Sequence, residues 1–371
     1  MKILSVNTGS SSVRLAAFIN SGSVPKKLAD RHIKLNESTP EAILRAFVNE
    51  SNFKDVQCIA HRVVHGGTKL LQPCLINSEI ENEINRLSPM APLHNPSALK
   101  WIRICRELFG QNVPQVAVFD TAFYSQMPEV AKTYALPRDI CIEHGIRRYG
   151  FHGLAHSAML QRWQGIRPDI KYGGRVISLQ LGAGCSITSI RDGKAVDTSM
   201  GFSPLEGLVM ATRSGDIDPE ILLFLQKSGG LTADEIHKML SESSGLLGLS
   251  GISNDMRVLL ESDAPEARLA IDLYCYRARK YIGSYLSVLN GADVILFGGG
   301  VGENASLIRE RILHDMKWCG IELDRRINND TIGIEGRITS SSSKIEAWVI
   351  SVDEAAVLAK EAFTVIGGLN E

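Results

Sequence analysis

The chain has 371 residues, which is longer than a single hydrophobic core usually grows, so we expect two domains. Its composition, 44% hydrophobic and 22% charged, is that of a globular protein, and a formal net charge of -1 gives no electrostatic reason to expect nucleic-acid binding. No apolar run approaches the roughly 20 residues that a membrane helix needs, so we expect no membrane segment.

The N-terminus and the cysteines indicate a cytoplasmic protein. Met1 to Val6 leads directly into a strand and does not resemble a signal peptide. The seven cysteines are scattered, odd in number and form no Cys-x-x-Cys pair. That pattern favours reduced, buried thiols over disulfides or a zinc site.

In the first part of the chain, short apolar strands alternate with helices. Ile3–Asn7 and Val13–Ile19 are predicted as strands joined by a polar corner at 8–12, with a turn at 20–22. Thr39 is a candidate N-cap for a helix over Glu41–Val48. The further elements expected here are a strand over Val56–Val64 ending in His65-Gly66-Gly67, two helices flanking the loop at 91–96, a buried strand over Gln115–Phe119 ending at Asp120, and a helix over His152–Trp163.

The second part begins with a hairpin. Arg175–Leu181 is an apolar strand that turns at Gly182-Ala183-Gly184 and returns as a second strand, and Asp192-Gly193 favours a type I′ turn at its far end. The elements expected after it are helices over Pro219–Leu225 and Ala233–Leu240, a turn-rich segment at 243–255, a long helix over Pro265–Leu289, a strand over Asp293–Phe297 running into the glycines of 298–304, a helix over Ile308–Met316, a loop at 340–343, a strand over Ala347–Ser351 and a helix over Glu354–Phe363.

Two patterns recur in the two halves of the chain. ILSVNTGSSSVRLAAFINSG near the start is similar to VISLQLGAGCSITSIRDGK in the middle, and each half contains a later apolar strand that runs into a polar or glycine loop, VAVFDTAF and VILFGGGVG. Such self-similarity indicates duplication. We therefore predict an α/β protein of two duplicated domains that face each other across a cleft.

The hairpin and the segment after it have features of an anion site. A glycine corner between two strands lets backbone N–H groups approach an anion without obstruction by a Cβ atom. Arg213 stands among small polar residues beside Ser214-Gly215-Asp216, and Arg62 lies in HRVVHGG, next to glycines. A guanidinium is well suited to phosphate and carboxylate oxygens, although a surface salt bridge is its usual role. These features predict an enzyme that handles phosphate.

Other candidates each have an ordinary structural alternative. Gly298 to Gly302 follows a strand and precedes a helix, which suits a nucleotide pocket or simply a tight turn, and it matches neither a Walker A loop nor a dinucleotide fingerprint. Asp120, at the end of a strand, is a candidate Mg²⁺ ligand or a turn residue, and Glu354 a second such acid or only the favourable acid of a first helical turn. His152 and His156 share a helix face, and His94 is held between prolines in PLHNP; no cysteine or carboxylate completes a zinc set around the pair.

Taken together, these stretches resemble the acetate kinase family (acetate and propionate kinases), which belongs to the wider sugar kinase, Hsp70 and actin fold group. The matching motifs, in family order, are NTGSSS, HRVVHGG, APLHNPSAL, VAVFDTAFYSQMP, IRRYGFHG, VDTSMGFSPLEGLVMATRSGDIDP, SGLLGLSGIS with DMR, and GVGEN. The resemblance implies two actin/Hsp70-like (ribonuclease H-like) domains and a Mg²⁺- or Mn²⁺-dependent, reversible transfer of phosphoryl from ATP to a short-chain carboxylate, acetate first. It assigns 1–124 plus 354–371 to an acyl-substrate-side domain and 125–353 to a nucleotide-binding and dimerisation domain.

The resemblance also implies roles for individual residues. Arg62 and Arg213 would grip the carboxylate and the transferring phosphoryl group, His152 would hydrogen-bond that group, and His94 would support it. Asp120 and Glu354 would place the metal ion, with Asn7 nearby. The remaining sets are Val64, Leu93, Phe151 and Pro204 around the acyl methyl; Ser10, Ser12, Arg14, Gly182, Ala183 and Gly184 around the phosphates; and Asp255, Met256, Arg257, Gly300, Val301, Gly302, Glu303 and Asn304 around the adenosine.

The chain departs from the family mainly on the nucleotide side. The family corner HLGNG is Gln180-Leu181-Gly182-Ala183-Gly184 here, so a side-chain donor to the phosphates is missing at Ala183. Arg14 stands for a lysine, Ala211 for a glycine and Ala355 for an acid. We hypothesise that the acceptor chemistry persists while the phosphoryl donor is bound differently or more weakly.

Several alternatives stay open from the sequence. A propionate or butyrate kinase would use the same residues, since an apolar pocket selects acyl length by only about 1–3 kcal/mol per methylene. A kinase that uses pyrophosphate or another donor would fit Ala183 and Ala211, and a non-catalytic, nucleotide-dependent regulatory protein is the alternative from a different class. The resemblance also implies a homodimer, with the helix after Pro265 as a candidate contact.

Overall fold

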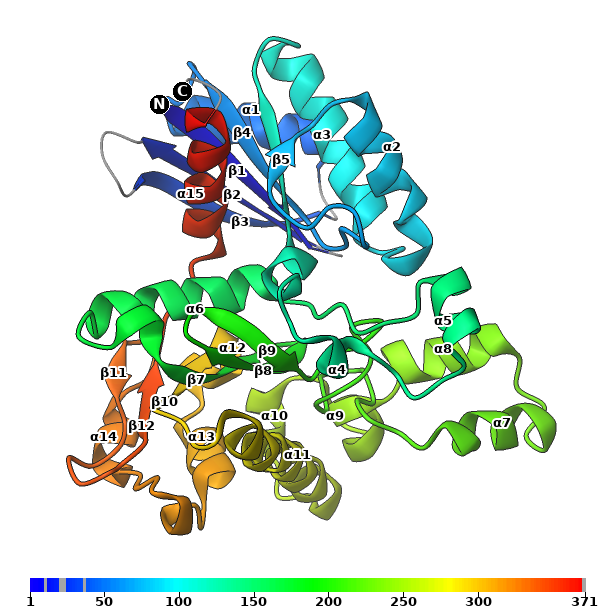
Figure 1. Cartoon of the computed structure of the whole chain (residues 1–371), viewed down its shortest axis with the longest axis vertical. Helices are drawn as coiled ribbons and strands as arrows, with labels where there is room; N and C mark the ends of the chain where they lie inside the picture. Colours follow the sequence, from blue (N-terminus) through cyan, green and yellow to red (C-terminus); the bar gives the residue numbers. More distant parts are fainter. Residues whose placement is uncertain (10–11, 20–24, 36–37, 369–371) are drawn as a thin grey trace. The chain divides into compact units, whose positions relative to one another are not determined.

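The computed structural model describes residues 1–9, 12–19, 25–35 and 38–368 and divides into two compact units (Figure 1). Unit 1 comprises Met1–Ser125, His152–Ala158 and Asp353–Glu371, and unit 2 comprises Gln126–Phe151 and Met159–Val352. The two predicted boundaries, after residue 124 and after residue 353, each lie within one residue of a division between the units, after Ser125 and after Val352. The segment His152–Ala158, which we had assigned to the second domain, packs with unit 1.

Unit 1 contains a six-stranded mixed sheet. Its order is β3-β2-β1-β4-β6-β5, and β1, β4 and β6 run parallel while β2, β3 and β5 are antiparallel to their neighbours. In the β1–β2 hairpin, Asn7 pairs with Arg14. The strands are β1 (Lys2–Thr8), β2 (Ser12–Ile19), β3 (Lys26–Lys34), β4 (Cys58–Val63), β5 (Cys74–Leu75) and β6 (Gln115–Phe119).

Helices cover both faces of this sheet. Side chains alternate between the faces of a strand: Leu4 and Val6 of β1 belong to a core cluster with Phe47 and Trp101, whereas Asn7 faces the other way and bonds Glu354. Figure 1 shows α15 over one face and α1 and α3 behind the other. The helices of the unit are α1 (Pro40–Glu50), α2 (Ser78–Arg86), α3 (Asn95–Phe109) and α15 (Glu354–Gly367).

Unit 2 repeats the same sheet. Its order is β11-β12-β10-β7-β8-β9, with β7, β10 and β12 parallel and the β7–β8 hairpin in the place of β1–β2. The two sheets therefore confirm the predicted duplication. The strands are β7 (Arg175–Leu181), β8 (Cys185–Arg191), β9 (Lys194–Thr198), β10 (Val294–Gly298), β11 (Gly336–Arg337) and β12 (Glu346–Val349).

Strand positions refine the repeat that the sequence suggested. VAVFDTAF contains β6, whereas VILFGGGVG contains β10, which takes the place of β4 in the sheet order. The glycine segment after β10 therefore corresponds to HGG after β4, not to Asp120 after β6. The strand of unit 2 that matches β6 is β12.

The helices of unit 2 surround its sheet, with α11 packed on β7 and β8. The predicted type I′ turn at Asp192-Gly193 is confirmed, since both residues have positive φ, 50° and 83°. The helices are α4 (Glu129–Lys132), α5 (Arg138–His144), α6 (Gly153–Ile166, whose first residues belong to unit 1), α7 (Pro219–Lys227), α8 (Ala233–Glu242), α9 (Gly245–Ser250), α10 (Met256–Leu260), α11 (Pro265–Leu289), α12 (Gly299–Asn304), α13 (Ser306–Leu313) and α14 (Arg325–Asp330).

β3, α9 and α12 are among the elements that the sequence-based expectation did not contain. β3, with the sequence KKLADRHIK, was not predicted, because it lies at a sheet edge, where charged residues are tolerated and often favoured. The segment predicted as turn-rich contains α9, and the glycine segment at 299–304 is the short helix α12. Glycine content concealed both helices, since glycine is a poor helix former.

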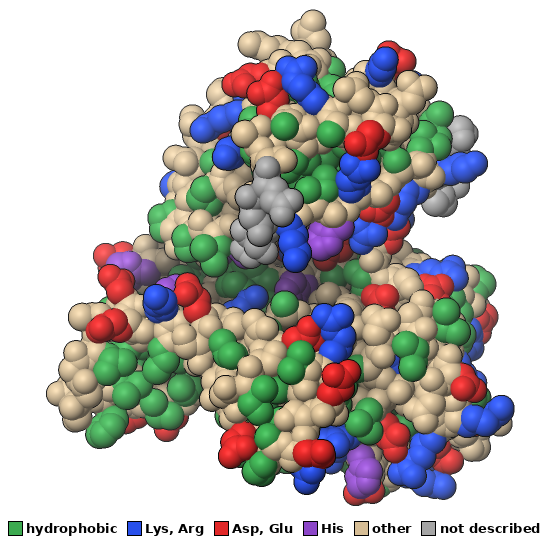
Figure 2. Space-filling model, turned by 180° about the vertical axis from the view of Figure 1, so that it is seen from behind, with side chains coloured by type: hydrophobic (Ala, Val, Ile, Leu, Met, Phe, Trp, Pro, Cys, Tyr) green, Lys and Arg blue, Asp and Glu red, His purple; other side chains and the backbone are tan. Residues whose placement is uncertain are grey.

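Charge is mixed on the molecular surface. Figure 2 shows acidic and basic side chains interspersed over the face that it displays. Within the described part of the chain, no helix is both long and apolar enough to span a membrane.

Candidate active site

In unit 1, the predicted Arg62, Asp120, Asn7 and Glu354 form one connected cluster. Arg62 in β4 donates from Nε and Nη2 to the same Asp120 oxygen, Oδ2, at 3.1 and 2.6 Å, and its Nη1 lies 3.2 Å from Asn7 Oδ1. Glu354 Oε2, at the start of α15, accepts from Asn7 Nδ2 at 2.6 Å and lies 3.6 Å from Arg62 Nη1. The parallel strands β1, β4 and β6 bring these side chains together because all three end at the same edge of the sheet.

Burial shifts the pKa of an acidic group in this cluster. Asp120 is fully buried, and its pKa is raised by loss of solvation and by the neighbouring Glu354 carboxylate, while Arg62 opposes the rise. The approach to Asp120 also needs a glycine: a Cβ atom at Gly153 would lie 1.9 Å from the Asp120 carbonyl oxygen. Leu154 N, one residue further along α6, donates to Asp120 Oδ1 at 3.4 Å.

The oxygens of this cluster suit Mg²⁺ that arrives with phosphate. Among the described residues, no group of three His, Cys, Asp or Glu side chains forms a closed metal cage. Mg²⁺ usually takes only one or two carboxylates and completes its octahedron with water and substrate phosphates. Asp120 and Glu354 are two such hard oxygen donors, so the residues present fit the ion.

His152 has an unusual backbone conformation at the start of α6. Its φ is 57°, in the left-handed region that non-glycine residues rarely occupy, at a cost of order 1–3 kcal/mol. Its carbonyl accepts from His156 N at 3.0 Å and so opens the helix. His156 is fully buried, and burial lowers its pKa to about 3. The two histidines therefore do not form a surface pair, whereas strain at His152 is typical of a functional position.

The other predicted residues of unit 1 are dispersed. Ser10 lies outside the described residues. Ser12 Oγ contacts His32 Nε2 at 2.9 Å, and Arg14 donates from Nε and Nη2 to the two carboxylate oxygens of Asp30, at 2.8 and 2.6 Å. Among the acyl-pocket candidates, Val64 is buried and Leu93 is 64% exposed, while His94 precedes the first residue of α3.

Arg213 in unit 2 is a partly buried cation with a neutral partner. Its Nη1 donates to the Pro204 carbonyl oxygen at 2.8 Å. No carboxylate lies within ion-pair distance of its guanidinium in the described part of the chain, and burial lowers its pKa. Ala211 N donates to Ala183 O at 3.0 Å, which joins this loop to the corner between β7 and β8.

Side chains outside the predicted set hold the Arg213 loop in place. Asp216 Oδ1 accepts from Gly207 N at 2.9 Å, and Tyr281 of α11 donates to Asp216 Oδ2 at 2.8 Å. Glu206 binds Arg148 at 2.6 Å. The Arg213 loop is thus fixed from α11 and from the segment before α6.

A pocket of about 750 Å³ lies beside this loop, wholly within unit 2. Its size is within the range of small-molecule sites. It gathers eight of the residues predicted around the nucleotide, from three separate stretches of sequence. They are Gly182, Ala183, Asp255, Met256, Arg257, Gly300, Val301 and Asn304.

Three predicted nucleotide residues of unit 2 do not line this pocket: Gly184, Gly302 and Glu303. Glu303 Oε1 accepts from Gly299 N at 3.1 Å and from Val352 N at 3.2 Å, so its carboxylate supports the backbone. Asp255 caps α10 and pairs with Arg257 at 2.6 Å, and hydrogen bonds from Arg257 lower its pKa to about 2.

The sequence profile of the Acetokinase family matches residues 26–360. The chain belongs to that family. It is 45% identical over 343 residues to the acetate kinase of Chloroherpeton thalassium (89% of this chain, 82% of that protein) and 42% identical over 390 residues to that of Campylobacter jejuni subsp. jejuni (97% and 98%).

Solved structures of the family have the same fold. The acetate kinase of Porphyromonas gingivalis superposes with a TM-score of 0.89 at 34% identity, and a propionate kinase from Francisella tularensis with 0.88 at 36%; each alignment covers 98% of this chain and 99% of the other. The expected family, fold class and type of enzyme are therefore confirmed. This member of the Acetokinase family is a phosphotransferase whose acceptor is a carboxyl group.

Sequence reasoning missed part of the site of this family member. Leu246 and Ala305 belong to motifs already recognised, SGLLGLSGIS and the stretch after GVGEN, so their neighbourhood was a usable signal. No sequence signal pointed to Tyr281, because it is one polar residue within a long helix. The pocket residues missed are Leu246, Asn254, Leu260 and Ala305.

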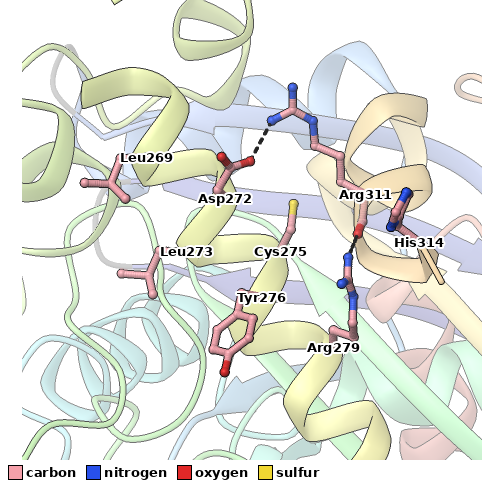
Figure 3. Close-up of a pocket in the computed structure, with 8 residues that line it drawn as sticks. All are labelled: Leu269, Asp272, Leu273, Cys275, Tyr276, Arg279, Arg311 and His314. Carbon is pink, nitrogen blue, oxygen red and sulfur yellow. Dashed lines mark hydrogen bonds and ion pairs between the residues drawn. The ribbon is translucent and has the colours of Figure 1, made fainter. Parts of the chain in front are cut away.

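A second pocket, between α11 and α13, has no feature of the reaction. Figure 3 shows its arginines already engaged: Arg311 pairs with Asp272 at 3.0 Å, and Arg279 Nη2 donates to the carbonyl oxygen of Arg311. Arg279 Nε also donates to the carbonyl oxygen of Ile312 at 3.1 Å. Its volume is about 490 Å³, and Leu269 and Tyr276 expose apolar surface at its edge. None of the predicted site residues lines it.

Proposed function

We propose that this chain catalyses the reversible, Mg²⁺-dependent transfer of the γ-phosphoryl group of ATP to acetate, which gives acetyl phosphate and ADP. The observation that carries the proposal is Arg213, a partly buried guanidinium whose partner is the neutral Pro204 carbonyl. A cation removed from water without a counter-ion is costly. An anionic reactant is the partner that would offset that cost.

The acceptor needs little activation by the protein. A carboxylate is already a nucleophile, so no general base is required. The main tasks are to align two anions and to neutralise the charge that accumulates between them, which arginines do well. Arg213 would take this charge directly, while Arg62, fixed by Asp120, would orient the second anion, and His152 would donate a hydrogen bond to the transferring group.

Asp120 and Glu354 would hold the metal ion. Bound Mg²⁺ supplies charge neutralisation at phosphate oxygens and a template for their orientation. In the protein itself, Asn7 keeps Glu354 in place through its 2.6 Å hydrogen bond, and Gly153 leaves room for Asp120.

A nucleotide is favoured over pyrophosphate as the donor. The 750 Å³ pocket gathers Met256, Leu246 and Val301, apolar surface that a pyrophosphate ion would not use. Ala183 and Ala211 also line it, so phosphate contacts there come from the backbone rather than from these side chains. We propose ATP bound with fewer side-chain contacts than a corner asparagine would give.

We also propose that the chain acts in the cytoplasm as a homodimer, as the family resemblance implies. Leu269 and Tyr276 of α11 are 61% and 55% exposed, which is apolar surface that a second copy could cover. Light scattering tests this directly: a dimer has twice the 40.6 kDa of one chain. A mass of one chain over the micromolar range would contradict it.

Trapping of acyl phosphate tests the catalytic proposal. Hydroxylamine converts acetyl phosphate to a hydroxamate, whose iron(III) complex is coloured, so acetate, propionate and butyrate are compared with ATP or pyrophosphate as donor. The expected result is most product from acetate with ATP and Mg²⁺, partial activity with Mn²⁺ and none with EDTA. Turnover with pyrophosphate but not ATP, or with butyrate far above acetate, would replace the proposed substrates. No product with any combination would sink the proposal.

A further inference from the structure

The nucleotide pocket depends on a very short helix. α12 has only six residues, Gly299–Asn304, and three of them, Gly300, Val301 and Asn304, line the pocket. A helix of this length has few internal hydrogen bonds, and its last carbonyl groups have no partners within it. Something outside α12 must therefore hold its C-terminal end.

Arg309 of α13 supplies that support. Its side chain is fully buried, and its Nη1 donates to the carbonyl oxygens of Gly302 and Glu303 at 2.8 and 3.1 Å. Its other nitrogens donate to α14 and the residue after it: Nε to Asn328 Oδ1 at 2.8 Å, and Nη2 to the carbonyl oxygens of Asn328 and Thr331 at 2.9 and 2.5 Å. The guanidinium thus joins the end of α12 to the end of α14.

The charge of Arg309 is balanced by these oxygens alone. In the described chain no Asp or Glu lies within ion-pair distance of it, and burial lowers its pKa to about 10. A buried cation without an acid is normally unfavourable. Here it stands at the negative end of a helix dipole and fills every position of a rigid donor fork, which a lysine could not do.

We infer that Arg309 is a positioning residue for the nucleotide: it fixes the C-terminal end of α12, so that Gly300, Val301 and Asn304 face the pocket. The inference rests on the proposed function, because it takes the ligand of that pocket to be a nucleotide. Arg309 itself does not line the pocket, so it acts only through α12.

Further contacts make α12, α13 and α14 one assembly. Asn328 Nδ2 donates to Ser306 O at 2.9 Å, and Gly333 N donates to Glu303 O at 3.1 Å. At the opposite end of α13, Arg279 of α11 donates to the last carbonyl groups of the helix (Figure 3). α13 is therefore held at both ends, and Arg309 transmits its position to α12.

The test compares Arg309→Lys with Arg311→Lys. Arg311 is two residues away on α13, and its side chain pairs with exposed Asp272 at the second pocket (Figure 3). For Arg309→Lys we expect ADP to bind at least 10-fold more weakly by calorimetry and KM for ATP to rise at least 10-fold, with KM for acetate within 2-fold. Arg311→Lys should match the wild type within 2-fold in all three quantities.

The outcomes separate this inference from the proposed function. A wild-type protein that does not bind ADP would overturn both. Wild-type binding with an unchanged affinity in folded Arg309→Lys would overturn the inference alone, and so would equal rises in KM for ATP and acetate, which indicate a general structural defect. If Arg309→Lys does not fold, Asn328→Ala removes one acceptor of the fork; ADP affinity should fall at least 3-fold, and an unchanged affinity would overturn the inference.

Discussion

Arg62 in unit 1 and Arg213 in unit 2 are assigned to the same reaction, but their surroundings are opposite. Arg62 binds Asp120 through two nitrogens and lies near Glu354, and these acids raise its pKa. Arg213 donates to a carbonyl oxygen, and burial lowers its pKa. Arg62 is neutralised by the protein, whereas Arg213 has no acidic partner among the described residues.

The two arginines therefore differ in how their charge is balanced in the absence of a substrate. In unit 1 the charge of Arg62 is balanced by Asp120 and Glu354 before any substrate arrives, so removing Arg62 would leave two carboxylates without their cation. In unit 2 the buried charge of Arg213 is unfavourable without a counter-ion, and a bound anion would offset that free energy. A preorganised cation of this kind favours negative charge that develops in the transition state. The two arginines should therefore respond to mutation in opposite ways.

The largest effect is expected at Arg213. Arg213→Gln should lower kcat by about 10³–10⁵-fold, the range for an arginine that stabilises a transferring phosphoryl group. The free energy of unfolding should not fall, because a buried cation without an acid partner has been removed. Steady-state kinetics and urea denaturation measure the two quantities.

Arg268→Gln is the control for Arg213, because Arg268 is an exposed residue of α11 whose partner is Asp263. It should change neither quantity. A kcat within 10-fold of the wild type for Arg213→Gln, or a clear loss of stability, would remove the contrast between the two arginines.

Arg62→Met should instead destabilise the protein. Breaking a buried ion pair leaves Asp120 without its partner beside Glu354, at a cost of about 3–5 kcal/mol in the free energy of unfolding. The pKa of Asp120, already raised by burial, should rise further. The folded state then binds more protons than the unfolded state, so the deficit should shrink as the pH falls toward the unfolded value of 3.8.

Urea denaturation at several pH values measures the Arg62→Met deficit. Arg45→Met removes an exposed pair with Glu41 and should cost only about 0–1 kcal/mol at any pH. If Arg62→Met lowers the free energy of unfolding by no more than Arg45→Met does, or by an amount that does not change with pH, the ion pair of Arg62 contributes no more to stability than a surface pair.

Acid should weaken unit 1 more than unit 2. Its buried histidines have depressed pKa values, about 4 for His61 and His65 and about 3 for His156, with burial as the main cause. Below the ordinary value of 6.5, the unfolded state binds protons that the folded state does not, so stability falls from pH 6.5 down to about 4. At about 1.36 kcal/mol per pKa unit, His61 alone accounts for roughly 3 kcal/mol.

Hydrogen exchange at pH 7 and pH 5 distinguishes the units. The strands of unit 1 should lose protection first, and His61→Gln, which keeps an amide near Gln115, should reduce the pH dependence. His237→Gln, at an exposed position of α8, is the control. Equal loss in both units, or an unchanged profile in His61→Gln, would contradict the expected difference.

Most of the fold and much of the candidate site could be predicted from long sequence motifs. The hairpins were predictable because alternating apolar residues and Asp192-Gly193 act locally. The gathering of eight pocket residues followed from the resemblance, since each lies in a stretch that the family shares.

The partners of the charged residues were not predictable. The sequence shows Arg62 and Arg213 beside glycines in both cases, and only the fold determines that Asp120 faces one and the Pro204 carbonyl the other. Long-range contacts such as those of Arg309 and Tyr281 leave no local signal. The strain at His152 is equally invisible, because φ is set by packing and not by residue type.

The smallest effect is expected at Tyr281, which tests how the Arg213 loop is held. Tyr281→Phe removes the donor to Asp216 Oδ2 at 2.8 Å and should cost about 1–2 kcal/mol in stability, since hydrogen bonds to charged groups are stronger than neutral ones. Asp216 keeps its bond from Gly207 N, so the loop should loosen rather than unfold, and kcat should fall several-fold with KM for ATP unchanged. Tyr172→Phe, at an exposed position of unit 2, is the control. If kcat is unchanged in Tyr281→Phe despite the loss of stability, the backbone contacts of the loop are sufficient to position Arg213. Arg213 would then need no side-chain contact from α11, in contrast to Arg62, which is held by the side chains of Asp120 and Asn7.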